Sequence, residues 1–442
     1  MKRIRLSFAA LCIGLTALWL VADPVFAGAH QFSQIQLSFI NYTGIIAMGV
    51  MSVSMLLALR SVALEPYVGG LDKSYRLHKW LGVAGLVMAV AHWLWIQSPS
   101  WLAAVGWMAP VPRRGAPPGT AEGFSLARTL QGPALSVGQW CFYATVILVV
   151  LALLKWFPYR YFLKTHRLLA VVFLILVFHS VVLLKTAYWT HAISYVIAVL
   201  MAAGSAAAIF ILFRKVGRTR QAVGQIDAIT AHQDGRILGV SICLKDRWVP
   251  HEAGQFAFVT FDAAEGPHPF TISSTWTGDG RLTFLIKGLG DYTQALPATL
   301  TPGSLVTVEG PYGHFTFNGR HQQQIWISAG IGITPFVSRM QHLATWSDGK
   351  TIDLFHATAV RDEQATVQLF RLAAAAKVRL HLWVTAEEGL LTAAQVKGDV
   401  PGWREADIWF CGPVAFGKSL RKDLVAAGLP DGAFHQELFH LR

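Results

Sequence analysis

Charged residues are scarce in this sequence, and cysteines are few. Only 14% of the 442 residues are Asp, Glu, Lys or Arg, whereas an ordinary soluble domain has about 25%. With 53% hydrophobic residues, this scarcity excludes a disordered chain and argues against a wholly soluble protein. The four cysteines, Cys12, Cys141, Cys243 and Cys411, form no CxxC pair. A disulfide framework and an iron–sulfur cluster on four neighbouring thiolates are therefore excluded.

Acidic residues are nearly missing from the first half of the chain. Residues 1–220 hold 19 Lys and Arg but only 4 Asp and Glu, a net charge of +15. Residues 221–442 hold 18 and 21, a net charge of −3. A basic, apolar half followed by a nearly neutral one predicts a membrane domain followed by a soluble one. Because the basic residues lie beside apolar stretches, membrane topology explains them and nucleic-acid binding is not expected.

Long apolar stretches recur six times in the basic half, and a membrane-spanning helix needs about 20 mainly apolar residues. The first stretch has a second interpretation. Lys2 and Arg3 precede it and the small-residue segment Phe26–Ala29 follows it, as in a secretory signal peptide. We favour a retained helix, with the signal peptide as the alternative. The expected helices are Leu6–Val21, Phe39–Leu59, Trp80–Ile96, Val137–Leu154, Leu168–Leu184 and Ile193–Phe213.

The distribution of Lys and Arg among the loops predicts the orientation of these helices. Basic clusters follow the second, fourth and sixth helices, whereas the loop after the fifth has only Lys185 and the loop after the first has none. The loop expected at Gln97–Ser136 carries three arginines. Because it is long and rich in proline and glycine, these arginines count little in assigning the orientation. Since basic loops face the cytoplasm, we expect the N-terminus and the whole second half there.

Four histidines inside the apolar half form two pairs. His78 and His92 are 14 residues apart on the third expected helix, and His166 and His179 are 13 apart on the fifth. At 1.5 Å per residue these separations are about 21 and 20 Å, so the rings lie at two matched depths. Imidazole is an axial ligand of haem iron, so two stacked haems are predicted rather than ordinary polar packing. Because 13 residues leave His166 and His179 about 140° apart around the helix axis, the two side chains do not point in the same direction. The fifth helix therefore needs a bulge, a tilt or differently rotated haem planes.

The second half changes to short β-type runs. Val240–Leu244 and Arg281–Lys287, with turn residues between such runs, predict a small antiparallel barrel. From Gln324 onward, runs such as Ile325–Ser328 and Arg379–Val384 alternate with helical segments, which predicts an α/β unit with a parallel sheet. The expected fold is therefore multi-domain: a six-helix transmembrane bundle, an antiparallel β-barrel domain and an α/β nucleotide-binding domain.

A glycine-containing turn joins the first strand of this α/β unit to a helix. Its sequence over Ser328–Pro335 is SAGIGITP. Glycines let the backbone approach a pyrophosphate, and a helix N-terminus favours the anion. The third glycine of the dinucleotide fingerprint is missing, so an ordinary tight turn stays open as an alternative.

Four short motifs together resemble the NADPH-oxidase and ferric-reductase superfamily. They are HPFTISS over His268–Ser274, GPYG over Gly310–Gly313, GIGITP over Gly330–Pro335 and CGP over Cys411–Pro413, in the order that the family shows. With the two histidine pairs, the resemblance covers nearly the whole chain. It implies a bacterial transmembrane flavocytochrome b of the inner membrane, with FAD, NADPH (NADH being possible) and two haem b groups as cofactors.

The resemblance also implies domain boundaries. A ferric-reductase-like bundle would occupy residues 1–216. A ferredoxin-reductase-like barrel that binds FAD would occupy residues 217–320, and an NAD(P)H-binding domain residues 321–442.

Site residues follow by matching this chain to the family motifs. His268 to Thr271 would line the isoalloxazine, Thr271 would hydrogen-bond its edge, and Lys287, Gly288 and Thr293 would hold the pyrophosphate. The expected cofactor ligands are His268, Pro269, Phe270, Thr271, Ser274, Lys287, Gly288, Thr293, Gly330, Gly332, Thr334, Pro335, Arg361, Cys411, Gly412 and Pro413; the expected iron ligands are His78, His92, His166 and His179; and the expected catalytic residues are Thr271, Cys411 and Phe439. Each of three residues keeps an alternative interpretation: Lys287 as a surface lysine, Cys411 as a small buried residue and Phe439 as a core phenylalanine.

The nucleotide preference can be argued from the second strand of the α/β unit. NAD-selective enzymes place an acidic residue at the end of this strand, whereas an arginine accommodates the 2′-phosphate of NADP. Here the strand ends Phe355–Thr358 without a carboxylate, and Arg361 follows. We therefore expect NADPH, with Asp362 as the residue that argues for NADH.

Hydride transfer moves two electrons and haem accepts one, so a flavin must stand between NADPH and the haems. Depth in the membrane gives the order NADPH, FAD, inner haem and outer haem, and then a small-molecule acceptor on the outer face. Superoxide-producing family members carry a His one turn beyond the outer ligand, where this chain has Ile96, and an Arg on the second helix, which has none before Arg60. Oxygen and ferric chelates therefore both stay open as acceptors. A membrane-tethered flavin reductase without haem transfer and a passive haem-binding module are the alternative functions.

Overall fold

The computed structural model describes residues 2–25, 31–108, 126–232 and 236–437. The chain divides into two compact units. The first is helical and ends at Val216, and the second begins at Gly217 and holds two β-sheets. The candidate cleavage site of a signal peptide, at Phe26–Ala29, lies outside the described residues.

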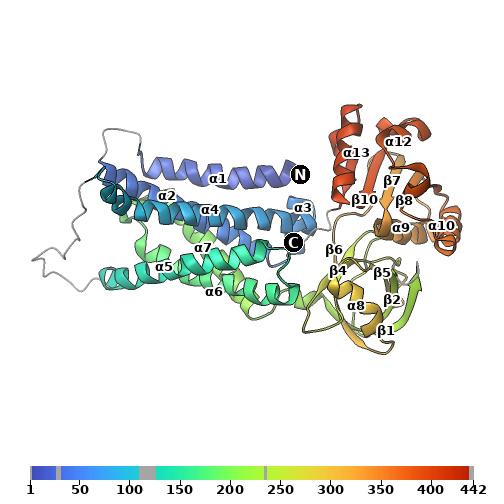
Figure 1. Ribbon diagram of the computed structural model, residues 1–442, viewed down its shortest axis with the longest axis horizontal. Helices are drawn as coiled ribbons and strands as arrows, with labels where there is room; N and C mark the ends of the chain where they lie inside the picture. Colours follow the sequence, from blue (N-terminus) through green and yellow to red (C-terminus); the bar gives the residue numbers. More distant parts are fainter. Residues whose placement is uncertain (1, 26–30, 109–125, 233–235, 438–442) are drawn as a thin grey trace, which may run out of the picture. The chain divides into compact units, whose positions relative to one another are not determined.

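Within the described residues, six helices of the first unit are long and apolar enough to cross a membrane, which confirms the expected bundle. Most of them extend beyond the predicted bounds, because apolarity marks the membrane-spanning part and the helix continues into polar residues. They are α1 Lys2–Ala22, α2 Phe32–Leu57, α4 Leu71–Ala104, α5 Leu126–Leu153, α6 Tyr159–Leu183 and α7 Ala192–Leu212 (Figure 1).

The largest difference from the sequence prediction concerns the loop expected at Gln97–Ser136. Instead, α4 continues through Pro99 to Ala104, and α5 begins at Leu126 and contains Pro133. The abundance of proline suggested a loop, which was wrong at both ends of this segment. A proline removes only its own N–H donor, and near a helix end the neighbouring turns keep the helix intact.

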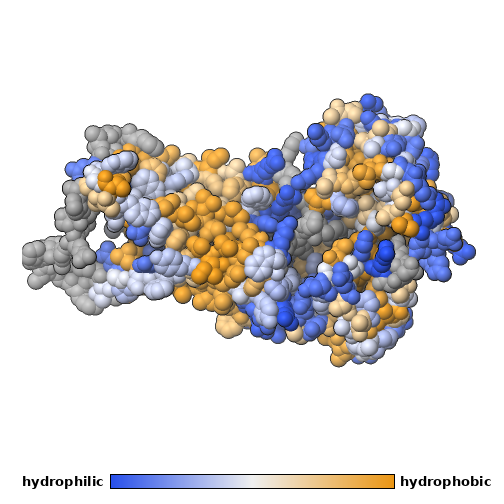
Figure 2. Space-filling model, in the orientation of Figure 1, coloured by the Kyte–Doolittle hydropathy of each residue, from blue (hydrophilic) through white to orange (hydrophobic). Residues whose placement is uncertain are grey.

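The outer surface of the bundle is apolar. Ile147 of α5 and Val199 of α7 have 59% and 69% of their surface exposed. Figure 2 shows that hydrophobic residues gather over the middle of the helices. A patch of this size in water would be an interaction or aggregation surface. In a bilayer it contacts hydrocarbon, so the exposed side chains fit a membrane-spanning bundle.

A buried carboxylate connects the end of α1 to the segment between α6 and α7. Asp23 Oδ2 accepts hydrogen bonds from the Tyr188 hydroxyl at 2.5 Å, Lys185 Nζ at 3.0 Å and Ser38 Oγ at 2.9 Å. Burial raises the pKa of Asp23, but the three donors outweigh burial and lower the pKa below its usual value. The ionised carboxylate therefore fastens α1 to the bundle at neutral pH.

The second unit begins with an antiparallel sheet in the order β4-β3-β6-β1-β2-β5. An isolated bridge between Ile272 and Phe284 joins the end of β4 to β5, so the sheet closes on itself as the expected barrel. Its core contains the fully buried Val240, Phe284 and Val308. The elements are β1 Gln221–His232, β2 Ile237–Leu244, β3 Phe256–Thr260, β4 His268–Thr271, β5 Arg281–Lys287, α8 Asp291–Thr299 and β6 Leu305–Tyr312.

A parallel five-stranded sheet follows, in the order β11-β10-β7-β8-β9. The chain starts in the middle at β7, adds β8 and β9 on one side, and then adds β10 and β11 on the other. The direction of winding therefore changes between β7 and β10, and ligands of open α/β sheets bind at such a point, beyond the carboxyl ends of the strands. The elements are β7 Gln323–Ala329, α9 Thr334–Thr345, β8 Thr351–Thr358, α10 Glu363–Ala375, β9 Arg379–Val384, α12 Ala393–Asp399, β10 Asp407–Cys411, α13 Val414–Ala426 and β11 Phe434–Gln436.

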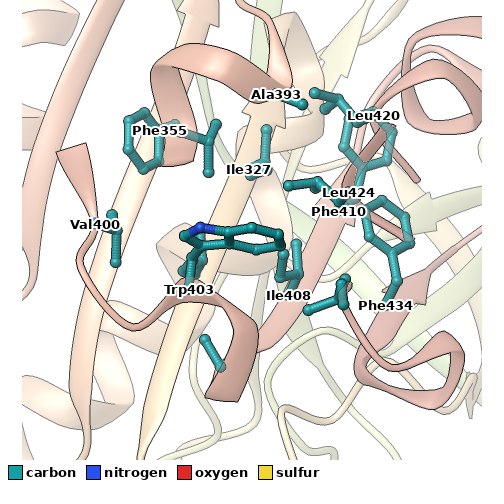
Figure 3. Close-up of a cluster of buried hydrophobic side chains, with 14 of the residues drawn as sticks. Ile327, Phe355, Ala393, Val400, Trp403, Ile408, Phe410, Leu420, Leu424 and Phe434 are labelled. Carbon is teal, nitrogen blue, oxygen red and sulfur yellow. The ribbon is translucent and has the colours of Figure 1, made fainter. Parts of the chain in front are cut away.

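Helices cover both faces of this parallel sheet. Phe336 and Met340 of α9 pack on one face, over Trp326. On the other face, Leu420 and Leu424 of α13 lie against Phe410 (Figure 3). Truncating such a buried aromatic side chain costs about 3–5 kcal/mol. The two packed faces hold the strands rigidly, and the carboxyl ends of β7 and β10 remain as the edge where loops can bind a ligand.

Candidate functional site

The carboxyl ends of β7 and β10 bring two of the sequence motifs together. Ser328 and Cys411 are direct partners in the parallel register, so the turns that follow them start side by side. A Cβ on Gly332 would collide with the carbonyl of Cys411, and Gly330 has a φ of +55°. Glycine is needed at Gly332 for close approach and at Gly330 for a left-handed backbone. Gly412 is equally close to β7, because a Cβ on it would lie 3.0 Å from the Cβ of Ala329.

The turn ends in the first residues of α9. The Thr334 hydroxyl donates to the Ile331 carbonyl at 3.2 Å, and Pro335 occupies the first turn of the helix, where a missing N–H costs nothing. Pro413 immediately precedes α13 in the same way. Both motifs therefore present a helix N-terminus at the switch point, which is an electrostatically favourable place for a phosphate group.

Cys411 is buried at this point, with 1% of its surface exposed. Burial raises the pKa of its thiol well above the usual value, and the nearby carboxylate of Glu437 raises it further. The thiol is therefore neutral at physiological pH. It can pack against a ring or donate a weak hydrogen bond, but it is a poor nucleophile.

The two residues that bear on nucleotide preference differ in their surroundings. Arg361 is half exposed, and its guanidinium lies 3.5 Å from the carboxylate of Glu387. Asp362 is the N-cap of α10, and its Oδ1 accepts a hydrogen bond from the Ala365 N–H at 2.9 Å. The carboxylate that argued for NADH is thus occupied as a helix cap, whereas the arginine faces solvent.

A partly buried polar pair at the same edge of the sheet was not predicted from the sequence. His356 of β8 lies with Nδ1 2.9 Å from the hydroxyl of Ser328 on β7. Burial lowers the pKa of His356 to about 4, so the ring is neutral at physiological pH. In the sequence, His356 stands only at the end of an apolar strand, and the strand pairing that brings it to Ser328 is set by the tertiary fold.

In the barrel, β4 carries the HPFT motif. Thr271 pairs with Phe256 of β3 and has 7% of its surface exposed. The ring of His268 stacks on Tyr292, with centroids 4.3 Å apart and planes 22° apart. Burial lowers the pKa of His268 to about 4, against an opposing effect of Asp291. The ring is therefore neutral, and the stack orders the segment between β4 and α8.

Lys287, Gly288 and Thr293 line one cavity of about 220 Å³ beside α8. The Thr293 hydroxyl accepts hydrogen bonds from the backbone N–H groups of Leu289 and Gly290, at 3.0 and 3.1 Å. Thr293 therefore shapes the loop in the described structure, and Lys287 and Arg236 are exposed cations that line the same cavity. The expectation that Thr293 also holds a pyrophosphate stays a prediction.

Ser274 joins the barrel to the α/β domain within the second unit. Its carbonyl accepts hydrogen bonds from His251 Nε2 at 2.9 Å and from Ser338 Oγ of α9 at 2.8 Å. Its hydroxyl accepts one from the Thr283 N–H at 3.0 Å. Ser274 is therefore engaged in holding the two domains together. Phe439, one of the expected catalytic residues, lies outside the described residues.

In the helical unit, the four histidines come together in two pairs. The ring centroids of His78 and His166 are 5.8 Å apart, and those of His92 and His179 are 6.3 Å apart. Two metal–imidazole bonds of about 2 Å each put the bonding nitrogens about 4 Å apart, and each centroid lies about one ring radius farther out. Both spacings therefore fit one iron between the rings. α6 is continuous over Tyr159–Leu183, so the rings meet without the bulge that the 13-residue step suggested.

The other nitrogen of three of these rings is held by a neighbouring helix. Nδ1 lies 2.9 Å from the Ser54 carbonyl for His78, 2.9 Å from the Ile40 carbonyl for His92 and 2.7 Å from the Ala134 carbonyl for His179. A carbonyl only accepts, so Nδ1 carries the proton and Nε2 keeps its lone pair. This is the tautomer that a metal ligand needs. Among the described residues, no group of three or more His, Cys, Asp or Glu side chains forms another metal site.

Comparison with known families agrees with this division of the chain. Residues 43–177 match the family described as "Ferric reductase like transmembrane component", and residues 228–316 match the family described as "FAD-binding domain". The chain has the domain architecture of the NADPH oxidase and ferric reductase superfamily. Three of the paired histidines lie inside the first match, and His179 follows its end by two residues. The domains are those of a membrane flavin-dependent oxidoreductase.

Curated relatives match less than half of this chain. A flavohemoprotein of Xylella fastidiosa (strain Temecula1 / ATCC 700964) is 28% identical over 207 residues, which cover 43% of this chain and 51% of the relative. An NADPH oxidoreductase of Mycobacterium tuberculosis is 27% identical over 214 residues, which cover 47% and 52%. This chain spans about half the length of these curated relatives.

A solved structure shows the fold. The flavohemoglobin of Malassezia yamatoensis superposes with a TM-score of 0.50 at 17% identity, over 91% of this chain and 98% of that one. At this identity the likeness extends to the arrangement of elements alone. With the family matches, it confirms a ferredoxin-reductase-like pair of domains after the membrane bundle.

Proposed function

We propose that this protein moves electrons from cytoplasmic NADPH, through FAD and two b-type haems, to a small-molecule acceptor on the outer face of the membrane. The acceptor is oxygen, which yields superoxide, or a ferric chelate. The basic loops support a cytoplasmic location for the N-terminus and for the second half of the chain, and the bacterial inner membrane is the proposed location.

The observation that carries this proposal is the pairing of His78 with His166 and of His92 with His179. Each pair has a spacing that fits one iron, and three of the four rings are held in the ligand tautomer by a carbonyl. Histidines are rare inside membranes and costly to bury there without a function. When bound, haem supplies one-electron redox chemistry with these imidazoles as axial ligands. The protein's part is to fix the two pairs at different heights of α4 and α6.

The second unit would supply the two-electron donor. The switch point between β7 and β10 is the proposed NADPH site, where the tight turn through Gly330 and Gly332 would present the N-terminus of α9 to the pyrophosphate and Arg361 would meet the 2′-phosphate. In the barrel, Thr271 and the neighbouring residues of β4 would hold the flavin ring. Buried, neutral Cys411 would pack near the nicotinamide and exclude water from it.

An absorption spectrum of the detergent-purified full chain, before and after anaerobic addition of NADPH, tests the proposal. We expect a low-spin b-type spectrum, about two haems per chain, and reduction of both by NADPH. His92→Ala should remove one haem and leave flavin reduction by NADPH intact. His191→Ala is the matched control, because His191 lies outside the pairs, at the N-cap of α7.

Other results would assign a different function. Bound flavin without haem, together with NADPH oxidation, would make the protein a membrane-tethered flavin reductase. Haem that NADPH does not reduce would make it a passive haem-binding module. Unchanged haem content in both His92→Ala and His179→Ala would contradict the assigned ligands.

The acceptor needs its own measurement. Ile96 is 43% exposed on α4 and gives no hydrogen bond or proton to an oxygen species. We therefore expect some superoxide in air and competition by ferric chelate for the same electrons. Cytochrome c reduction with and without superoxide dismutase, repeated anaerobically with ferric chelate, separates them. Fully dismutase-sensitive reduction without chelate reduction would assign an oxidase, and the opposite result a metal reductase.

A further inference from the structure

Helix α2 contacts both histidines of α4 but contributes none of the four paired histidines. Near one end, Nδ1 of His78 lies 2.9 Å from the hydroxyl of Ser54 and 2.9 Å from its carbonyl. Near the other end, Nδ1 of His92 lies 2.9 Å from the Ile40 carbonyl and 3.2 Å from the Thr43 hydroxyl. The same combination of one carbonyl and one hydroxyl therefore recurs at both depths.

The hydroxyl of Thr43 is oriented to accept from the ring. It donates its own hydrogen to the Phe39 carbonyl, at 2.8 Å, one turn back along α2. Its oxygen lone pairs are then left for the N–H of His92. Ser54 and Thr43 are both buried, with 6% and 4% of their surface exposed, so water does not compete for these contacts.

Glycines of the neighbouring helices face both outer rings, and at Gly138 the lack of a side chain is what lets the ring lie this close. Gly44 follows the Ile40 carbonyl by four residues, and its Cβ position is 3.5 Å from the ring of His92. Gly138 of α5 follows the Ala134 carbonyl by four residues, and a Cβ there would collide with the ring of His179. A carbonyl acceptor is thus followed, one turn later, by a residue without a side chain at both outer histidines.

The contacts have a chemical consequence if Nε2 binds iron. Acceptors on Nδ1–H make the imidazole a stronger electron donor, which stabilises the oxidised metal and lowers its reduction potential. A hydroxyl in addition to a carbonyl strengthens this effect. Because Ser54 touches only the inner pair and Thr43 only the outer pair, the two sites can be adjusted separately.

We propose that α2 is a tuning helix, in which the hydroxyls of Ser54 and Thr43 set the reduction potentials of the inner and the outer haem independently. Both are positioning residues that act through His78 and His92. The proposal rests on the haem ligation proposed above, and it goes further in assigning a role to a helix without ligands.

The test is a spectroelectrochemical titration of the full chain in detergent, which resolves two midpoint potentials. Thr43→Val keeps the size of the side chain and removes the hydroxyl, and Ser54→Ala does the same at the inner site. We expect each variant to shift one midpoint upward, a different one in each case, and the double variant to shift both. Electron paramagnetic resonance of the oxidised protein should show a changed low-spin signal for one haem in each single variant.

Two controls separate tuning from general disturbance. Thr43→Ser keeps the hydroxyl and should retain both wild-type midpoints. Ser52→Ala removes another buried hydroxyl of α2, which donates to the Met48 carbonyl at 2.7 Å, and should also leave both midpoints unchanged.

Several outcomes would overturn the proposal. Unchanged midpoints in both Thr43→Val and Ser54→Ala, with two haems bound, would do so. So would equal shifts in Thr43→Val and Thr43→Ser, or a shift of both midpoints by either single variant. A wild-type protein without haem would instead contradict the proposed function, before these variants are compared.

Discussion

The Tyr188 hydroxyl donates a hydrogen bond of 2.5 Å to the carboxylate of Asp23, and Lys185 binds the same oxygen at 3.0 Å. Hydrogen bonds to a charged, buried group contribute about 1.5–3 kcal/mol each. Since Asp23 follows α1 and its partners precede α7, this contact connects the first and last membrane helices through their ends.

Replacing Asp23 by Ala should therefore destabilise the bundle by about 2 kcal/mol. Thermal unfolding in detergent, followed by circular dichroism, measures the loss. Asp227→Ala is the control: its carboxylate pairs with Arg281 where both side chains are well exposed, so a change within about 0.5 kcal/mol is expected. Equal stability of Asp23→Ala and the parent protein would show that the apolar packing of α1 suffices.

The pH dependence of this contact follows from the lowered pKa of Asp23. A carboxyl group whose pKa is lower in the folded state stabilises the fold above its unfolded pKa, and the stabilisation is lost as pH falls through the folded pKa. We expect the stability difference between Asp23→Ala and the parent to be constant from pH 5 to 8 and to shrink below about pH 4. A difference that grows on acidification would contradict the assigned charge.

A side chain at Gly138 should interfere with the outer histidine pair. Gly138→Ala puts a methyl group against the ring of His179, and Gly138→Val adds more bulk. We expect haem content to fall from about two to about one per chain in the valine variant, measured by the pyridine haemochrome assay. Gly132→Ala on the same helix is the matched control, because nothing lies within 4 Å of its added Cβ. Full haem content in Gly138→Val would show that α5 moves to accommodate the larger side chain.

Thr271→Val tests the flavin site. The substitution preserves the shape of a buried side chain and removes the hydroxyl that we assign to the flavin edge. Reduction of the haems by NADPH, followed in a stopped-flow instrument, should slow by about tenfold, which corresponds to the loss of about 1.4 kcal/mol of stabilisation. Thr283→Val serves as the control, since its hydroxyl bonds Ser241 within the barrel. If FAD occupancy and rate both stay at the parent value, Thr271 is structural.

Arg361 and Asp362 are adjacent but should respond differently to substitution. Arg361→Ala should raise the Michaelis constant for NADPH more than that for NADH, because only NADPH has the 2′-phosphate. Asp362→Ala removes the cap of α10 and should cost about 0.5–2 kcal/mol in stability without changing the ratio of the two constants. Steady-state kinetics with both nucleotides decides. If Arg361→Ala raised the Michaelis constants for NADPH and NADH equally, Arg361 would not be the residue that selects NADPH.

Some of this architecture could be predicted closely from local sequence. The strand bounds Arg281–Lys287 and Arg379–Val384 were predicted correctly, because apolar alternation and flanking turn residues mark them. β1 was not predicted, and neither was the three-residue β11. Short or weakly patterned strands depend on their partners, and β11 exists because Phe434 pairs with Ile408 of β10.

The candidate site divides in the same way. Spacing along the sequence indicated which histidines lie at equal depth, since helix rise is constant. It could not indicate that Ile40, Ser54 and Ala134 offer carbonyls to those rings, because every residue has a carbonyl and only helix packing selects one. Likewise, the capping role of Asp362 depends on where α10 begins, which is a question of one or two residues.

The length of α4 has a mechanical consequence. Its 34 residues extend about 51 Å, whereas the hydrocarbon core of a bilayer is about 30 Å thick. A transmembrane helix tilts to match its hydrophobic stretch to the bilayer, and the tilt changes with bilayer thickness. His78 and His92 belong to this one continuous helix, so a tilt keeps their separation along the helix axis of about 21 Å and shortens only the difference between their depths in the membrane. Under the proposed function, the thickness of the surrounding bilayer thereby acts on the difference in depth between the two haem sites.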